Sequence, residues 1–341
     1  MEISNNLRKE NLKMAKIINK ILKKLTPETI KVEMEIIKKK RLSPAIKKWV
    51  KRYEKLGERD RFIWMWLSRM LSIIQLPIIS KKYRKSLLEI KLLIVMFLVQ
   101  LDDVADKNQK QNLLKELLKI PLEQNYIHAC HLNSRDKKYL LFTQKLWNYI
   151  IRKIKKYPRY KEFKEIFYYD VNQMLNAMRY SYILNTYPYL INKTESWLFI
   201  SHNMGFFIYF DLDLMCAPNF NFKILGPMRE IVWRIQKMAR IGNWVSTWER
   251  EIGEKDFTSG VFAYAIDSGV IFVDELKEKK ESEVIKKIKK AKIEDRLLKE
   301  WEQYYYEIKE LSKKIKGFGA SEILPRFEKL LVGHLISRGY K

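Results

Sequence analysis

Apolar residues recur three and four positions apart along most of the chain, and lysine and glutamate fill many of the positions between them. This spacing is typical of amphipathic α-helices. It predicts helices over residues 7–57, with breaks near Thr26-Pro27 and Ser43-Pro44. A second helical block, over residues 58–100, becomes progressively more apolar toward its end.

The same spacing continues to the end of the chain. It predicts a helix in LLKELLKI that stops at Pro121, and further helices over residues 136–156, 161–185 and 194–215. A long helix begins at Gly226-Pro227, and the Gly- and Ser-containing stretch DFTSGVFAYAIDSG is followed by charged helices, a GFGAS loop and a closing helix over residues 322–337. Because no internal repeat or change in composition marks a boundary, we expect one all-α domain over residues 1–341, with residues 1–57 as N-terminal helices.

Composition agrees with a helical, globular chain. Gly and Pro number only 11 and 9, and the 47% hydrophobic content is enough to form a sizeable core. The two cysteines, Cys130 and Cys216, form no CxxC pair, so neither a disulfide framework nor a zinc module is indicated. The longest apolar runs are too short to span a bilayer. We therefore expect a soluble protein of the reducing cytoplasm.

The chain carries 67 Lys and Arg against 40 Asp and Glu, a net charge of +27. Such a surplus fits a nucleic acid, an anionic membrane surface or an anionic substrate. Much of it lies in stretches such as IIKKKRLSPAIKKWVKR, where helical spacing of the apolar residues leaves the lysines on a solvated face. No zinc-finger spacing, Gly-aromatic RNA-binding signature or compact arginine cluster is present, so we expect no specific nucleic acid.

An abrupt cluster of acid interrupts this basic background in LVQLDDVADKNQ, where Asp102, Asp103 and Asp106 end an apolar run. On a helix, Asp102 and Asp106 lie one turn apart on the same face, and Asp103 lies to one side. Clustered carboxylates repel one another, so they either point into solvent at a helix end or share a cation. Their oxygens suit Mg²⁺, which completes its shell with water and phosphate oxygens. Both interpretations stay open for this motif alone.

A second polar cluster lies in RIGNWVSTWEREIGEKD, where Asn243, Thr247 and Glu251 are four residues apart. They form one stripe along about 12 Å of helix and offer an amide oxygen, a hydroxyl and a carboxylate, which together make an all-oxygen ligand set. Arg250 is placed to reach a phosphate that the same metal holds. The alternative is a polar stripe on a buried helix, whose groups would need other hydrogen-bond partners.

Together the two clusters resemble the motifs of class I terpene synthases of the microbial single-domain type. DDVAD at 102–106 is similar to the aspartate-rich motif of the family, and NWVSTWERE at 243–251 is similar to its Asn, Ser-or-Thr, Glu motif. The resemblance runs from about residue 60 to the C-terminus. It implies an antiparallel helical bundle around an apolar active-site cavity, with the two motifs facing each other across its mouth. Three Mg²⁺ ions, or Mn²⁺ as a substitute, would bind there with the substrate diphosphate.

The resemblance also implies the reaction, in which a linear geranyl, farnesyl or geranylgeranyl diphosphate ionises and its allylic cation cyclises or rearranges as diphosphate is released. Metal ions and arginine would neutralise the departing diphosphate. Aromatic faces in a dry cavity would steer the cation. The candidates for such faces, each of which is also compatible with ordinary core packing, include Phe97, Trp233, Trp244 and the run Phe206-Phe207-Ile208-Tyr209-Phe210.

The sequence departs from the family pattern at the arginine that senses diphosphate. In the family this arginine stands four residues before a helix-breaking glycine, which corresponds here to Gly205, but Ser201 occupies its place. A protonated His202 or Arg179 could replace it.

The C-terminus is a partial match to the family. Members tend to end with an Arg-Tyr pair that caps the diphosphate, whereas here Gly339 separates Arg338 from Tyr340. Two other functions stay open, namely a prenyl diphosphate synthase, which typically needs two aspartate-rich motifs, and a non-enzymatic basic helical protein that binds nucleic acid or an anionic membrane. Peripheral contact with an anionic membrane and a homodimer are both compatible with the sequence.

Overall fold

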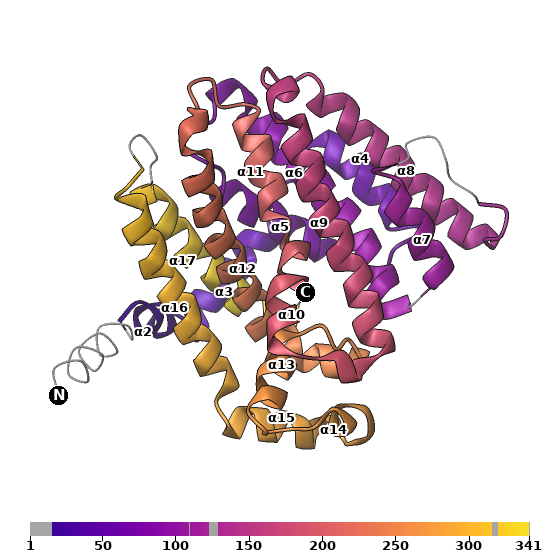
Figure 1. Ribbon diagram of the computed structural model, residues 1–341, viewed down its shortest axis with the longest axis vertical. Helices are drawn as coiled ribbons and strands as arrows, with labels where there is room; N and C mark the ends of the chain where they lie inside the picture. The colour runs from indigo at the N-terminus through magenta and orange to yellow at the C-terminus, as the bar shows by residue number, and fades with distance from the viewer. Residues whose placement is uncertain (1–15, 109, 123–128, 316–319, 341) are drawn as a thin grey trace.

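The computed structural model describes residues 16–108, 110–122, 129–315 and 320–340, and within these ranges the chain is all α-helical, with no strand (Figure 1). The first half contains α2 (Lys16–Lys23), α3 (Pro27–Lys38), α4 (Pro44–Tyr53), α5 (Arg61–Ile73), η1 (Lys81–Tyr83), α6 (Arg84–Asp102), η2 (Asp103–Asn108), α7 (Gln111–Lys119), α8 (Ser134–Ile154) and α9 (Tyr160–Thr186). The second half contains η3 (Pro188–Leu190), α10 (Lys193–Leu198), η4 (Ile200–Met204), α11 (Phe206–Leu214), η5 (Phe222–Ile224), α12 (Leu225–Glu254), α13 (Gly260–Asp267), α14 (Val273–Glu278), α15 (Glu281–Lys290), α16 (Ile293–Ser312) and α17 (Ala320–Ile336). None of the described helices is both long and apolar enough to cross a membrane.

The predicted breaks between the N-terminal helices are confirmed. The side-chain oxygens of Thr26 and Ser43 accept hydrogen bonds from the backbone N–H groups of Thr29 and Ile46, at 3.2 and 3.4 Å. Proline follows each cap at the first helical position, where its missing N–H costs no helical hydrogen bond. Residues 7–15 of the predicted first helix lie outside the described residues.

Other predicted helices are divided more finely than their spacing suggested. The block over 58–100 consists of α5 and α6, and the segment 194–215 consists of α10, η4 and α11. Gly205 separates η4 from α11 with a φ of +68°, a left-handed conformation that glycine adopts without a Cβ penalty. The stretch DFTSGVFAYAIDSG contains helix α13, and most of GFGAS lies outside the described residues.

Two long buried helices organise the core. Helix α6 has buried apolar residues on all sides and packs against α5, α8 and α11. Helix α12 packs against α11, α13, α16 and α17, and Figure 1 shows α16 and α17 beside α12 on one flank while α7 and α8 form the opposite flank. The acid motif follows directly from α6 and the Asn, Thr, Glu motif lies on α12, so the packing of these two helices decides whether the motifs meet.

A buried ion pair joins α6 to α11. Lys91 Nζ lies 2.6 Å from Asp213 Oδ1, and the two side chains are only 1% and 2% exposed. The other carboxylate oxygen of Asp213 accepts a hydrogen bond from the backbone N–H of Leu76 at 3.2 Å. Such a pair adds little net stability against apolar packing, but removing one partner leaves a buried charge alone. It therefore fixes α6 relative to α11 and to the chain that leads into α6.

A close glycine contact joins α13 to α12. A Cβ on Gly260 would meet the ring of Trp244 at 2.5 Å, and Trp244 is fully buried against Trp197, with ring centroids 4.8 Å apart. A larger residue at this position would require the buried ring to shift, so glycine allows the close approach of the two helices.

We expect Gly260→Ala to lower the free energy of unfolding by about 1–3 kcal/mol, because the added methyl overpacks the Trp244 contact. The matched control is Gly253→Ala on the exposed face of α12, where the nearest side-chain atom is the flexible carboxylate of Glu281 at 3.3 Å. Gly253→Ala should be neutral or stabilising by about 0.5–1 kcal/mol. Urea unfolding of both variants measures the difference, and equal stabilities would contradict the packing described for α13.

Candidate active site

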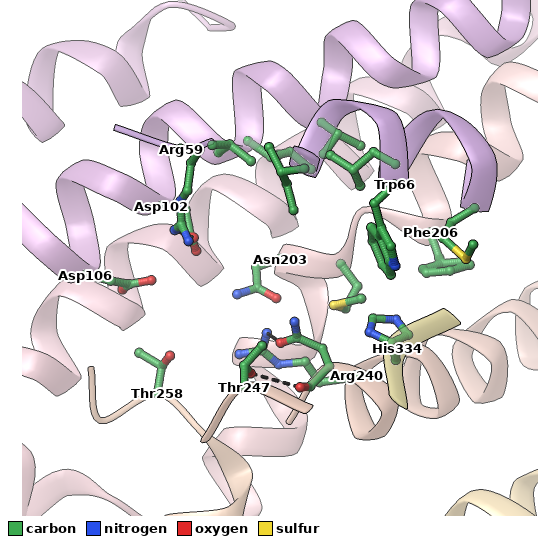
Figure 2. Close-up of a pocket in the computed structure, with 18 of the residues that line it drawn as sticks. Arg59, Trp66, Asp102, Asp106, Asn203, Phe206, Arg240, Thr247, Thr258 and His334 are labelled. Carbon is green, nitrogen blue, oxygen red and sulfur yellow. Dashed lines mark hydrogen bonds and ion pairs between the residues drawn. The ribbon is translucent and has the colours of Figure 1, made fainter. Parts of the chain in front are cut away.

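A cavity of about 200 Å³ lies between α5, α6, η4, α11, α12 and α17 (Figure 2). In Figure 2, Asp102, Asp106 and Thr258 lie at one end of it, and Trp66, Phe206 and His334 lie at the other. The apolar part of its lining comprises Ile63, Trp66, Leu67, Met70, Leu71, Ile74, Val95, Leu98, Val99, Met178, Met204, Phe206 and Leu330. The cavity is therefore polar at one end and apolar at the other.

Both predicted motifs line this cavity. From the α6 side come Asp102 and Asp106, and from the α12 side come Asn243, Thr247, Arg250 and Glu251. Residues that are far apart in the sequence thus share one buried space. Figure 2 shows Asp102 and Thr247 on opposite walls, with Asn203 between them.

Asp103 does not line the cavity. The chain passes from α6 into the π-helical segment η2 at this residue, and the wider turn of a π-helix changes the direction in which successive side chains point. Asp103 accepts a hydrogen bond from the Tyr53 hydroxyl at 2.9 Å and forms an ion pair with Arg59 at 2.7 Å. We therefore leave it out of the candidate metal ligands, because its oxygens serve the contact with the N-terminal helices.

Arg59 is a cavity residue that sequence reasoning missed. It lies between α4 and α5, and its guanidinium spans two aspartates, with Nε 2.7 Å from Asp103 Oδ1 and Nη2 3.1 Å from Asp102 Oδ2. Burial raises the pKa of Asp102, and the charge of Arg59 opposes that shift. No local pattern marks Arg59, since its partners lie more than 40 residues away.

The polar side chains on the α12 wall have few hydrogen-bond partners among the described residues. Thr247 donates to the backbone carbonyl of Asn243 at 2.8 Å, and Arg250 pairs with Glu254 one turn later. Glu251 Oε2 is buried and has no hydrogen-bond partner among the described residues. Burial, and then the nearby charge of Asp256, raise the pKa of Glu251 to about 7.

Asp256 is a cavity carboxylate that lies outside both motifs. Lys255 ends α12 with a φ of +54°, and the chain then turns so that Asp256 lines the cavity. Asp256 Oδ1 accepts hydrogen bonds from the N–H and hydroxyl of Thr258, at 3.0 and 2.7 Å. Burial, followed by the charges of Asp256 and Asp102, raises the pKa of Asp106 well above its ordinary value.

Neither Ser201, at the position of the expected diphosphate sensor, nor the two possible replacements for that sensor line the cavity. Ser201 is fully buried, and its hydroxyl has no hydrogen-bond partner among the described residues. His202 packs between Phe207 and Trp233, with ring centroids at 6.1 and 5.2 Å, and burial lowers its pKa, so the neutral form is favoured rather than the cation that would bind phosphate. Arg179 is exposed on α9.

The C-terminal pair also lies elsewhere. Arg338 forms an ion pair with Glu294 at 2.7 Å and is bonded to the carbonyl of Val245, while Tyr340 is 59% exposed and neither lines the cavity. Because carboxylates already engage Arg338, we correct the expectation that this pair meets a bound diphosphate in the conformation described.

Of the predicted aromatic and glycine positions, Phe206 and Tyr209 line the cavity. Phe97 instead packs on Trp147 at 4.7 Å, and Trp244 packs on Trp197. Trp233 also lies outside the lining. Gly205 makes the turn that brings its neighbours Asn203, Met204 and Phe206 into the lining, so the predicted helix break at this glycine is confirmed.

The donor set fits a hard cation such as Mg²⁺. In the described ranges, no three His, Cys, Asp or Glu side chains converge into a ready metal site. The carboxylates instead occupy different walls, together with an amide and a hydroxyl oxygen, and Glu251 Oε2 lacks a partner. A cation held by either wall would complete its shell with water or with oxygens of a bound anion, which is common for Mg²⁺.

No protein-family model and no curated protein matches the chain.

We expect metal-free protein to lose stability as the pH rises from 5 to 7. Between its ordinary pKa of 4.5 and the folded value of about 7, Glu251 binds more protons in the folded state than in the unfolded state, so the free energy of unfolding falls with rising pH. Glu251→Gln should reduce this loss by on the order of 1–3 kcal/mol. Urea unfolding in EDTA at both pH values measures it, and identical losses in both proteins would rule out the shift.

Proposed function

We propose that the protein is a Mg²⁺-dependent class I terpene synthase, which ionises a linear prenyl diphosphate and cyclises or rearranges the resulting cation. The observation that supports this most strongly is that Asp102, Asp106, Asn243, Thr247 and Glu251 line one cavity that is apolar at its other end. A substrate with a charged head and a hydrocarbon tail matches both ends. The surrounding described helices are also compatible with the helical bundle of that family.

The polar end would hold the diphosphate. The residues that would hold Mg²⁺ are Asp102 and Asp106 on one wall and Asn243, Thr247 and Glu251 on the other. The bound cations would neutralise negative charge on the leaving group. Arg250, on the α12 wall, supplies a fixed cation beside Glu251. When the allylic C–O bond breaks, its electron pair leaves with the diphosphate and an allylic cation remains.

The apolar end would protect and steer that cation. Trp66, Phe206 and Tyr209 present aromatic rings, which attract a cation without reacting as strong nucleophiles. Leu98, Val99 and similar residues exclude water from the space between them. Burial raises the pKa of Tyr209 and keeps its hydroxyl neutral.

A prenyl diphosphate synthase is the second candidate for this cavity. Asp256 is the observation that favours a prenyl diphosphate synthase, because this residue adds a carboxylate to the α12 side of the cavity. The α12 wall nevertheless offers the amide of Asn243 and the hydroxyl of Thr247 at the positions of the motif, and this mixed set favours the synthase that cyclises.

Substrate incubation separates the candidates. The purified protein with MgCl₂ is given geranyl, farnesyl or geranylgeranyl diphosphate, with and without isopentenyl diphosphate, and products are identified by gas chromatography and mass spectrometry. We expect hydrocarbon or terpene alcohol products without isopentenyl diphosphate. Products only in its presence would indicate chain elongation. No turnover, together with salt-dependent and Mg²⁺-independent binding to nucleic acid or anionic vesicles, would favour the non-enzymatic alternative.

We expect Asp102→Asn and Asn243→Ala each to reduce diphosphate release by roughly 100-fold or more, because each removes a ligand from the charge-neutralising end of the cavity. Asp274→Asn, at an exposed aspartate of α14, is the matched control and should retain full activity. A colorimetric diphosphate assay with circular dichroism as the folding check measures this. Full activity in both cavity variants would refute the assignment of the site.

A further inference from the structure

Helix α12 places a buried cation in the cavity that neither motif includes. Arg240 stands three residues before Asn243, on the same helical face, and its residue is only 6% exposed. Figure 2 shows it beside Thr247, across the cavity from Asp102. An arginine in this position faces the space where the two motifs meet.

The guanidinium of Arg240 uses few of its hydrogen-bond donors. It lies over the ring of Trp244 at 5.3 Å, and Nη1 donates to Asn243 Oδ1 at 3.0 Å, while Nε is buried without a hydrogen-bond partner among the described residues. Among the residues that the structure describes, no carboxylate lies within ion-pair distance of it. Guanidinium carries five donors, so most of its capacity is unused.

The other two cavity arginines differ in this respect. Arg59 is engaged by Asp102 and Asp103, and Arg250 is engaged by Glu254. Arg234, on the same helix but outside the cavity, pairs with Glu230 and Glu307 at 2.7 Å. Arg240 is thus the cavity arginine that reaches no carboxylate in the described part of the chain.

A buried cation without a bonded anion is costly. The charges of Glu251, Asp102, Asp256 and Asp106 act on Arg240 from a longer distance, and burial lowers its pKa more than they raise it. Metal cations bound to those carboxylates would weaken the electrostatic attraction between the carboxylates and Arg240. An anion brought into the cavity between the two walls would then be the natural partner for the free N–H groups, and a guanidinium can bind phosphate oxygens through two parallel hydrogen bonds.

We propose that Arg240 recognises the diphosphate of the ligand and supplies from α12 the contact that Ser201 cannot supply from η4. This inference rests on the proposed function only for the identity of the substrate, since the anion that Arg240 binds would be diphosphate whether it is free or attached to a prenyl chain. Its position one turn before Asn243 lets the same helix bind the anion and the cation together.

The test measures binding of inorganic diphosphate to the full chain by isothermal titration calorimetry in buffer with MgCl₂. The proteins compared are the wild type, Arg240→Gln, Arg240→Lys and the control Arg234→Gln. Gln removes the charge but can still donate a hydrogen bond to Asn243. Lys keeps the charge, but all its N–H donors are on one nitrogen. Inorganic phosphate and farnesyl thiolodiphosphate, which resists ionisation, serve as parallel ligands.

We expect Arg240→Gln to weaken diphosphate binding by about tenfold or more and Arg240→Lys to weaken it less, since charge-assisted hydrogen bonds are lost in the first and partly kept in the second. Arg234→Gln should bind as the wild type does. Equal weakening for the free and the prenyl-bearing ligand assigns Arg240 to the diphosphate itself. Wild-type affinity in the Arg240 variants that fold, as judged by circular dichroism, would overturn the inference, as would failure of the wild type to bind diphosphate. Should Arg240→Gln not fold, the Arg240→Lys affinity decides.

Turnover of prenyl diphosphates by the wild type is measured separately, so that the proposed synthase activity and the proposed role of Arg240 can be distinguished. Turnover with unchanged diphosphate affinity in the Arg240 variants leaves the synthase standing and removes Arg240 from the site. Diphosphate binding that depends on Arg240, without turnover of any prenyl diphosphate, leaves the anion site standing and removes the synthase.

Discussion

The structure depends on the burial of more acid in one cavity than the nearby bases neutralise. Five carboxylates and three arginines line the space between α6 and α12, and Asp106, Glu251 and Asp256 have no ion-pair partner among the described residues. Burial and the charges of neighbouring carboxylates raise the pKa of Asp106 and Glu251 by more than the cavity arginines lower it. A cation bound between the walls would relieve this repulsion. The expected instability of the metal-free site and the proposed binding of metal there would therefore have one cause.

The rest of the fold holds these walls in place. Lys91 and Asp213 join α6 to α11 inside the core, and Arg59 ties Asp102 and Asp103 to the N-terminal helices. Asn185 connects two acid-bearing segments, because its side chain donates to Asp106 at 3.2 Å and accepts from the backbone N–H of Phe257 at 2.7 Å. These are polar contacts between elements distant in sequence, and they surround a cavity whose other end is packed from Leu, Met and aromatic side chains. The charged groups thus lie at one end of the cavity, and the apolar groups that exclude water lie at the other end.

The features that could be predicted from sequence are those that depend on local spacing. Helical periodicity identified the all-α fold, Thr26 and Ser43 marked two helix starts, and a four-residue spacing put Asn243, Thr247 and Glu251 on one face. The direction of Asp103 could not be predicted, because it depends on a π-helical turn that spacing does not reveal. Arg59, Asp256 and Arg240 join the cavity through tertiary packing, although Arg240 shares the helical face of the second motif and could have been found from that spacing. The resemblance also directed attention to Ser201, His202, Arg338 and Tyr340, which do not line the cavity.

We propose that the two walls bind divalent cations and diphosphate together. Crystals grown with Mn²⁺ and inorganic diphosphate test it most directly, because Mn²⁺ is located by its anomalous scattering. We expect Mn²⁺ peaks beside Asp102 and Asp106 and beside Asn243, Thr247 and Glu251, with diphosphate between them. Mn²⁺ and diphosphate absent from this cavity, in crystals that contain both at saturating concentration, would contradict it.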